Sequence, residues 1–475
     1  MALAASTGPV IGKAIVDAAG RNAFTVRFPK LRHHADIIAA MHYVHTLRLA
    51  TLAISFSSLI PLGAQNGSEV KYQIYAGSTH AHTSYTWSHG DQFTKTDCQG
   101  IRVYGPKTPG DSLSVWSDGY VKSKTGCYSM YVINSFQLPS PDMQVKPNWE
   151  KSQGLPIAHF LAAKAKGFDF YVTTDHSQET VFSPISATNP AWMATKKAAV
   201  DATDANFVAI PGFEFSENDG PGGTGHINVI NSDGMMNALL PGVDLDVFYK
   251  WLPTAKPSGP GPVVASFNHP DAHQYAGFAG RTAGATDVLT LLEVINANNK
   301  IHYEGFLAAL DKGWKVSPVA GNDNHGLNGI QVQTSRTFVL ATSKTRAAIL
   351  DAMKHRRTYA SLDNDIQCRY RVNGQIMGST LPESKDFRFA IDIRDPDTAN
   401  PKDKITKIDI VKDGGVVVET YDVPEPGYSV VWSPTIHDDG SKYFFVRVWN
   451  AGGGDAPGAD PAKPIAWLAP VWTGR

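Results

Sequence analysis

Between residues 71 and 361, short apolar runs alternate with segments whose apolar positions have helical spacing. Strands are expected over these ranges: 72–76, 168–173, 208–211, 263–267 and 316–320. Helices are expected over 156–166, 302–312 and 345–355, and a glycine follows each of the first two as a C-terminal stop. Alternating strands and helices predict an α/β fold, and polar residues at the strand ends predict a site at the carboxyl edge of the sheet.

The pattern changes after Ser361, where helical spacing nearly vanishes and turn residues punctuate short β-type runs. These runs are 369–372, 387–393, 405–412, 416–420, 443–448 and 465–471. They predict an all-β sandwich of roughly one hundred residues. The segment 92–149 is weakly periodic and rich in Gly, Pro and Ser, so we expect it to form an insert that serves as a lid or rim.

The length of 475 residues exceeds what one hydrophobic core usually serves. We therefore expect an N-terminal extension over 1–64, an α/β barrel over 65–364 and a β-sandwich domain over 365–475. A hydrophobic content of 42% supports a globular protein, and the net charge of −1, without a basic stripe, argues against nucleic acid as a partner.

Residues 41–64 have the layout of a secretory signal. Arg48 precedes an apolar run that ends at the small pair Gly63 and Ala64. The run is too short and too rich in Ser and Thr for a stable membrane span. We expect translation to start at Met41, cleavage near Ala64 and a periplasmic or secreted protein; the alternative is an amphipathic helix of a cytoplasmic protein. After export, Cys98 and Cys127 could form a disulfide.

Histidines and carboxylates stand at the ends of the expected strands. His80 and His82 follow the first strand, and residues i and i+2 of an extended chain point the same way. The others are Asp175, His176, Glu214, His226, His269, Asp323 and His325. Even without Asp175, these nitrogen and oxygen donors exceed the needs of one tetrahedral ion and suit two or three divalent metals, with Zn, Mn, Fe and Co all compatible.

The ordered series HAHT, TTDHS, GFEFS, GHINV, NHP and GNDNH resembles the PHP (polymerase and histidinol phosphatase) family over residues 80–325. Segments RTFVLATSKTRAAILDAMKHRRTYAS and PIAWLAPVW resemble the exported branch that includes carbamate-ester hydrolases. The resemblance implies a distorted (β/α)7 barrel with these metal ligands: His80, His82, His176, Glu214, His226, His269, Asp323 and His325. It also leads us to look for a further ligand, for which His89 or Asp91 is the candidate.

Three residues near the expected ligands are predicted to serve catalysis. We expect Asp175 to orient a neighbouring histidine, the alternative being a carboxylate that caps the strand end. Glu293 and Asn296 follow another apolar run and are expected to line the pocket. Weaker pocket candidates are His273, Arg281 and His302, and Trp87, Trp116 and Tyr120 could form an aromatic wall.

The sequence lacks a GxSxG nucleophile elbow and a Walker A loop, which argues against serine-dependent hydrolysis and P-loop chemistry. Metal-assisted hydrolysis is the leading hypothesis, because paired divalent ions lower the pKa of a bound water from 15.7 towards about 7. The resemblance to the exported branch implies a small carbamate or carboxylic ester with an aryl leaving group. The wider family implies a phosphoester, and a binding protein with a vestigial metal site is the alternative from another class. The sequence does not indicate an oligomeric state.

Overall fold

The computed structural model describes residues 70–86, 152–216 and 225–475, together with the backbone of five further strands. The chain divides into two units, Met1–Glu69 and Val70–Arg475. In the first unit, β1 (Gly12–Val16) and β2 (Asn22–Val26) form an antiparallel pair. The expected signal segment over 41–64 lies outside the described residues. None of the helices in the described parts of the chain has the length and apolar character needed to cross a membrane.

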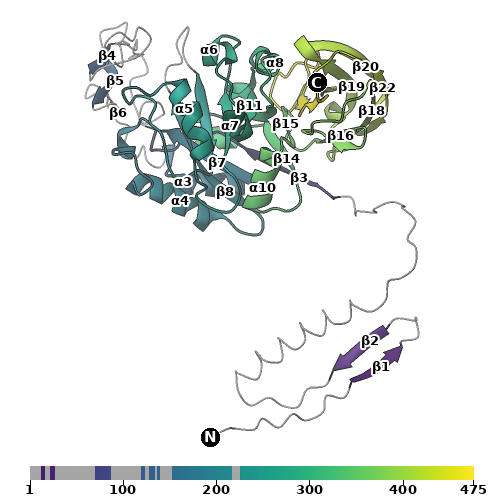
Figure 1. The fold of residues 1–475 in the computed structure, drawn as a ribbon, viewed down its shortest axis with the longest axis horizontal. Helices are drawn as coiled ribbons and strands as arrows, with labels where there is room; N and C mark the ends of the chain where they lie inside the picture. Colours follow the sequence, from purple (N-terminus) through teal and green to yellow (C-terminus); the bar gives the residue numbers. More distant parts are fainter. Residues whose placement is uncertain are drawn as a thin grey trace. The chain divides into compact units, whose positions relative to one another are not determined.

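Seven strands of the second unit are neighbours in one large sheet and follow the order of the chain; several of them are labelled in Figure 1. They are β3 (Gln73–Ser78), β7 (Phe170–His176), β8 (Val208–Ser216), β9 (His226–Ile230), β10 (Val264–Asn268), β11 (Leu289–Asn296) and β13 (Ser317–Ala320). Every residue of β7 to β11 is buried, as is usual for strands covered on both faces. The order is mixed rather than all parallel, because β9 runs antiparallel to both β8 and β10.

The first and last of these seven strands meet just beyond their carboxyl ends. Ala81 forms a parallel bridge with Asn324, and the N–H of His82 donates to the Asn324 carbonyl at 2.9 Å. The N–H groups of Asn322 and Asp323 donate to the His80 carbonyl at 3.2 and 3.1 Å. These bonds bring the segments after β3 and β13 side by side, which positions the predicted ligands of both. The complete (β/α)7 barrel stays a prediction.

The three expected helices are confirmed as α3 (Pro156–Ala165), α8 (Tyr303–Asp311) and α10 (Arg346–Lys354). The structure also contains helices that were not predicted: α4 (Pro190–Ala202), α5 (Leu245–Trp251), α6 (Gln274–Phe278), α7 (Ala283–Val288) and α9 (Leu327–Val332). Side-chain caps fix several helix starts. The Asn189 side chain accepts hydrogen bonds from the first two N–H groups at the start of α4, and Thr345 accepts one at the start of α10.

The segment after Ser361 forms two facing sheets. One sheet contains β16 (Gln367–Val372), β17 (Gln375–Ile376), β18 (Asp386–Arg394), β21 (Ser429–Trp432) and β22 (Thr435–His437). The other contains β19 (Ile405–Lys412), β20 (Val416–Gly427), β23 (Tyr443–Asn450), β24 (Ala466–Leu468) and β25 (Val471–Trp472). The run expected over 465–471 is divided between β24 and β25, with Pro470, which has no N–H to donate, in the gap.

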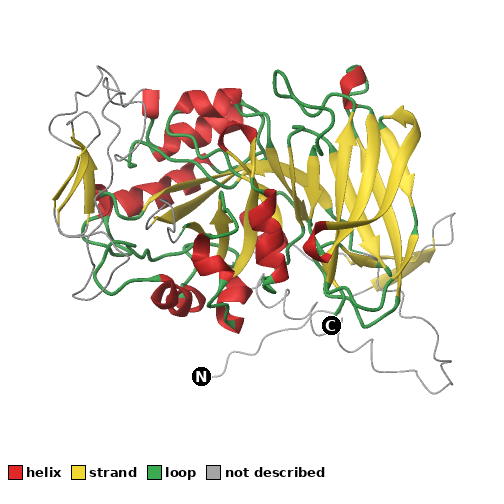
Figure 2. Ribbon diagram, turned by 90° about the horizontal axis from the view of Figure 1, so that it is seen from above, coloured by secondary structure: helices red, strands yellow, loops and turns green. Residues whose placement is uncertain are grey.

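The second of these sheets is a continuation of the large central sheet. Strand β15 (Thr358–Ser361) pairs with β14 (Arg336–Ala341) on one side and with β24 on the other. Alternate residues of β18 are buried in the core that also contains Ile408 and Ile410 of β19, which gives the expected sandwich packing. Figure 2 shows the helices gathered around one half of the unit and the strands of the sandwich forming the other half. The two expected parts thus share one sheet.

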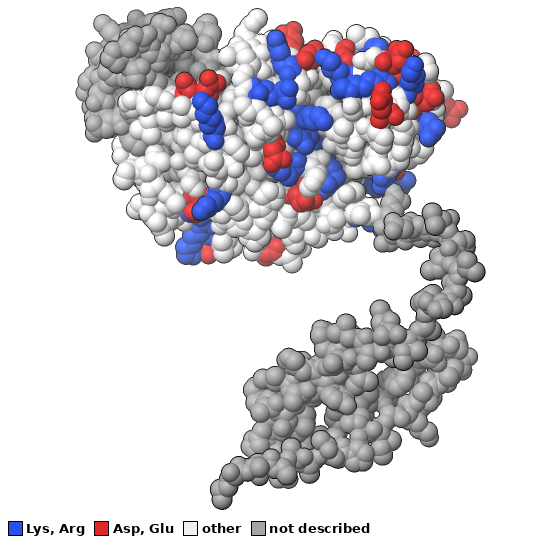
Figure 3. Space-filling view, viewed as in Figure 1, with Lys and Arg blue, Asp and Glu red and all other residues white. Residues whose placement is uncertain are grey.

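Within the expected insert, β4 (Gly119–Lys122), β5 (Tyr128–Ile133) and β6 (Phe136–Pro139) form a three-stranded antiparallel sheet. Several sequence-based candidates lie outside the residues whose side chains are described: Trp87, His89, Asp91, Cys98, Trp116, Tyr120 and Cys127. The role of the insert as a lid therefore stays a prediction. The space-filling view shows acidic and basic side chains interspersed over the strand-rich half (Figure 3).

Candidate metal centre

The eight predicted ligands come together at the carboxyl side of the central strands. Glu214, fully buried on β8, lies among five of the histidines. Its Oε2 is 2.9 Å from His176 Nε2, and its Oε1 is 3.2 Å from His226 Nδ1 and 3.7 Å from His269 Nε2. A carboxylate with both oxygens facing different imidazoles can serve two ions at once.

The remaining ligands surround Asp323, which follows β13. Its Oδ1 lies 2.9 Å from His82 Nε2 and 3.7 Å from His325 Nε2. His80 Nε2 lies 3.4 Å from both Asp323 Oδ1 and Glu214 Oε1. The contacts of His80 therefore join the group around Asp323 to the group around Glu214.

Three sets of side chains have donor atoms within 4.8 Å of one another: His80, His82 and Glu214; His82, Asp323 and His325; His176, Glu214 and His226. His82 and Glu214 each occur in two of these sets. The sets consequently form one connected cluster rather than three separate sites. This arrangement suits more than one divalent ion, and nitrogen and oxygen donors without thiolates fit Zn, Mn, Fe or Co.

The two histidines of the HxH motif are held so that one nitrogen of each faces the other. His80 Nδ1 lies 2.8 Å from Glu293 Oε1, and His82 Nδ1 lies 3.2 Å from Thr86 Oγ1. The Thr86 hydroxyl donates to Asp175 at 2.8 Å, so it accepts from His82. Both Nδ1 atoms then carry a proton, and the two Nε2 atoms face each other at 3.0 Å.

Facing lone pairs repel unless a cation or proton lies between them, so the orientation of the two rings fits a bound metal. His226 gives a second sign of fit. Its Nε2 lacks a hydrogen-bond partner and its Nδ1 has only the 3.2 Å contact with Glu214 Oε1, although the residue is only 4% exposed. Buried polar atoms are usually satisfied, and a metal bond at one of these nitrogens would satisfy it.

The charges in the cluster favour a cation. Burial opposes ionisation of Glu214, but the nearby His226 and His80 hold its pKa well below the usual value. Burial likewise opposes protonation of His80, yet Glu293, Asp323 and Glu214 raise its pKa from 6.5 to about 10. The first shift keeps Glu214 ionised, and the second reports the negative charge of the three carboxylates around His80, which a bound cation would balance.

Asp175 does not contact a histidine ring directly through a hydrogen bond in the described network. Its carboxylate accepts from the Thr83 N–H at 2.6 Å, the Thr83 hydroxyl at 2.8 Å and the Thr86 hydroxyl at 2.8 Å. Because Thr86 also contacts His82, Asp175 orients that histidine through the threonine. Burial raises the pKa of Asp175 to about 6, although these donors oppose the shift.

Glu293 lies behind the cluster, fully buried on β11. Besides facing His80, its carboxylate accepts from Asn296 Nδ2 at 2.8 Å and from the His269 N–H at 2.9 Å. Glu293 thus ties three segments of the site together. Of the two residues expected to line the pocket, Asn296 does so and Glu293 is not among the lining residues.

A cavity of about 530 Å³ opens onto the cluster. Besides five of the predicted ligands, its lining includes Gln274, Asn296, Asn298, Lys300 and His302. His302 was a weak candidate, and the other two weak candidates, His273 and Arg281, are exposed and lie outside the lining.

Sequence reasoning missed Lys300, Asn298 and Gln274 in the cavity wall. It also missed the support given to Glu214 by Asn268, whose Nδ2 donates to Oε1 at 2.7 Å. The one available signal was the position of Asn268 directly before His269 at the end of a strand.

No protein-family model and no curated protein matches the chain. A solved structure that matches it is a two-domain protein from Bacteroides vulgatus ATCC 8482 that contains a predicted PHP-like metal-dependent phosphoesterase. The two chains share 14% sequence identity, and the match covers 88% of this chain and 100% of the other with a TM-score of 0.39. No assignment is transferred at this level of similarity.

Proposed function

We propose that this chain is a metal-dependent hydrolase that cleaves an ester bond of a small molecule. The observation that carries the proposal is the connected cluster of seven ligand-type side chains, joined by His269 through its contact with Glu214, at the end of a cavity of about 530 Å³. The resemblance of the motif series to the PHP family supports the same proposal.

The residues of the chain divide the work of holding the ions and binding the substrate. The eight clustered side chains would hold two or three divalent ions, which supply a Lewis acid and lower the pKa of water from 15.7 towards about 7. Glu293 and Thr86 hold Nδ1 of His80 and His82 through hydrogen bonds, so that Nε2 of each ring is the atom that would bind a metal. Asn296 and Lys300 face the cavity, where they can donate hydrogen bonds to oxygens of the substrate.

Two ester classes follow from different observations. The resemblance to the exported branch favours a carbamate or carboxylic ester with an aryl leaving group. The described cavity lining favours a phosphoester, because besides Asp271 and the predicted ligands it contains a lysine and three carboxamides and no large apolar side chain. A lysine is a common phosphate-binding group. A vestigial site in a binding protein is less well supported, since the ligand-type side chains remain mutually positioned.

Elemental analysis and an ester panel test the proposal. Purified protein is expected to contain at least two divalent ions per chain. The variants His80→Ala and Asp323→Ala should lose metal and turnover together, whereas His437→Ala, at an exposed histidine of β22, should retain both. Unchanged turnover in both site variants contradicts the site. Less than one ion per chain, unaffected by added Mn or Zn, favours the binding protein.

The panel contains naphthyl methylcarbamate, naphthyl acetate and nitrophenyl phosphates. Hydrolysis of the phosphates alone would exclude the carbamate and carboxylic ester, and hydrolysis of the naphthyl esters alone would exclude the phosphoester. The Asp323→Ala variant serves as the blank for each substrate, because contaminating esterases would survive the substitution.

A further inference from the structure

A second group of acidic side chains lies in the strand-rich part of the chain. Asp363, Asp395 and Asp403 each offer one oxygen, and these three oxygens lie within 4.8 Å of one another. The residues are only 1%, 3% and 4% exposed. They come from three separate segments, which follow β15, follow β18 and form the short helix η4 (Pro401–Asp403).

The described residues provide no Lys, Arg or His ion pair to any of these three carboxylates. A buried carboxylate elsewhere in the same half does have basic partners. Asp409, 2% exposed, lies 2.9 Å from Arg447 Nη2 and 3.6 Å from Lys407 Nζ. Taking a carboxylate out of water is costly unless it is neutralised, so three together without a counter-charge call for another positive group.

An unsatisfied oxygen in the cluster points to a missing partner. Asp395 Oδ1 accepts from the Asp397 N–H at 2.9 Å, but the buried Oδ2 has no hydrogen-bond partner in the described structure. The neighbouring Asp363 carboxyl could donate to it only when protonated. Buried polar atoms without a partner are uncommon and often mark the place of an ion or water.

The neighbours of Asp363 fix its carboxylate in place. Oδ1 accepts from the N–H groups of Asp365 and Ile366 at 3.2 and 3.0 Å. Oδ2 accepts from Asn450 Nδ2 at 3.3 Å. The carboxylate is thus oriented by the backbone and by β23 before any ion arrives, which lowers the entropy lost on binding.

Further acidic groups, Asp365 and Asp455, add negative charge beside Asp363 and Asp395.

We propose that Asp363, Asp395 and Asp403 bind one Ca²⁺ ion that fastens the segments after β15 and β18 to the start of β19. Hard oxygen donors without imidazole or thiolate select an ion such as Ca²⁺ over Zn²⁺. Ca²⁺ also accepts irregular coordination by carboxylates, backbone carbonyls and water, whereas Mg²⁺ demands a near-ideal octahedron. This site is separate from the histidine cluster and does not depend on the proposed hydrolase activity.

Equilibrium dialysis of the whole protein with radioactive ⁴⁵Ca²⁺, in buffer freed of calcium and containing millimolar Mg²⁺, tests the site. We expect one Ca²⁺ per chain and a melting temperature that rises on adding Ca²⁺. Asp395→Asn keeps the side-chain shape and should weaken Ca²⁺ binding by about tenfold or more, because affinity depends on the number of charged ligands. Asp403→Asn should have the same effect, which guards against a folding defect in one variant.

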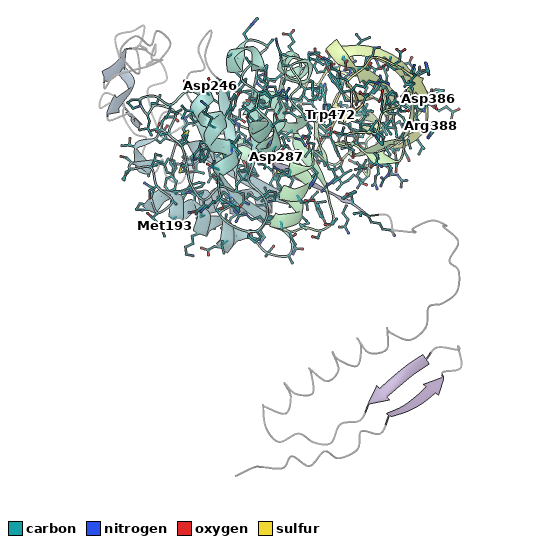
Figure 4. All side chains as sticks on the ribbon, in the orientation of Figure 1. Met193, Asp246, Asp287, Asp386, Arg388 and Trp472 are labelled. Atoms are coloured by element: carbon teal, nitrogen blue, oxygen red, sulfur yellow. The ribbon has the colours of Figure 1, made fainter. Side chains whose placement is uncertain are left out.

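Asp386→Asn is the matched control, because Asp386 lies on β18 with a side chain that is 61% exposed (Figure 4). This variant, and Asp323→Ala in the histidine cluster, should bind Ca²⁺ as the unchanged protein does. The proposal is overturned if the unchanged protein binds no Ca²⁺, or if both Asp395→Asn and Asp403→Asn bind it with unchanged affinity. Loss of binding in Asp323→Ala would place the ion in the histidine cluster instead, and equal affinity for Mg²⁺ would overturn the choice of Ca²⁺.

Discussion

Glu293 supports the candidate centre from behind through three hydrogen bonds. Its carboxylate fixes the His80 ring while Asn296 and the His269 N–H fix the carboxylate. Glu293→Gln keeps the size of the side chain but removes its charge. The NH₂ group that replaces one oxygen cannot accept a hydrogen bond, so the variant cannot satisfy all three donors. Loss of such a partner typically lowers metal affinity about 10–100-fold. We expect this loss in metal retention during dialysis against a chelator series.

Glu304→Gln is the control for this substitution, since Glu304 lies exposed in the first turn of α8. It should retain the metal like the unchanged protein. Equal metal retention by Glu293→Gln would show that the orientation of His80 does not depend on this carboxylate.

His159, on α3, connects the helix to the loop before it. Its Nε2 donates to the Gln153 carbonyl at 2.6 Å, and Gln153 in turn donates to the Thr83 carbonyl beside the HxH motif. Burial lowers the pKa of His159 from 6.5 to about 4. Below pH 6.5 the unfolded chain binds a proton at His159, whereas the folded protein does not bind it until the pH nears 4. The stability that the neutral, buried His159 contributes is therefore lost as the pH falls from 6.5 towards 4.

The expected loss is about 3 kcal/mol, from roughly 1.4 kcal/mol per pKa unit. We therefore expect His159→Gln to be less stable than the unchanged protein at pH 7.5, and the difference to shrink by up to that amount at pH 4. Urea unfolding at several pH values measures it. A difference that stays constant over this pH range would refute the assigned pKa shift of His159.

The ligand positions were predictable because each lies at or near one end of a recognisable apolar strand, as His226 does at the start of β9. Thr86 and Lys300 were not, because their roles depend on partners far away in the sequence. Thr86 acts through Asp175, 89 residues further along. Lys300 belongs to the short strand β12 (Lys300–Ile301), which turns back on β11 and so brings the lysine to the cavity. A local sequence pattern carries no information about contacts that form only in the folded chain.

At the scale of elements, the end of β13 approaches β11 and the segment after β3 very closely. A Cβ atom added at Gly321 would lie 1.9 Å from Glu293 Oε1 and 2.6 Å from His80 Cβ. The absence of a side chain at this position is what allows the pair to lie beside the strand end. Gly321→Ala should therefore displace Glu293 and His80 and lower both metal content and turnover, with a stability loss of about 1–3 kcal/mol from overpacking.

Gly234→Ala is the matched control, because no atom lies within 4 Å of the added Cβ and the backbone requires no positive φ there. Metal content and turnover should be unchanged in it. Normal metal content in a folded Gly321→Ala protein would mean that the strand end can shift without affecting the ligands.

Element type was predictable where the local signals agree, as in α8, where helical spacing ends at Lys312 and Gly313. It was not predictable for α6, in which Tyr275, Ala276 and Gly277 have positive φ values. The direction of β9 in the sheet was also not predictable from the sequence. Its antiparallel pairing with β8 and β10 follows from the path of the connecting segments and not from any pattern within the strand.

At the scale of the whole unit from 70 to 475, the sequence indicated a change of architecture near residue 365 but not that one sheet continues through it. Tyr359 of β15 pairs with Leu468 of β24, more than one hundred residues later. Trp467 and Trp472 share a core cluster with Phe306 of α8. In Figure 4, Trp472 lies between the helix-rich and strand-rich halves. Pairing over such a separation is set by tertiary packing, which local periodicity does not reveal.

The shared sheet predicts that both halves unfold together. Trp467 is 2% exposed and lies on β24, which pairs with β15 of the first half and with β23 of the second. Trp467→Ala removes a large buried side chain at this junction and should cost about 3–5 kcal/mol. Because the junction belongs to both halves, urea should release the metal of the histidine cluster and abolish the far-UV circular dichroism at one midpoint. The substitution should lower that midpoint for both signals.

Val431→Ala, on the exposed side of β21 in the second half, should change the free energy of unfolding measured by either signal by no more than about 0.5 kcal/mol. If Trp467→Ala shifts only the circular dichroism transition and leaves metal release unchanged, the halves are independent domains and the continuous sheet does not couple them.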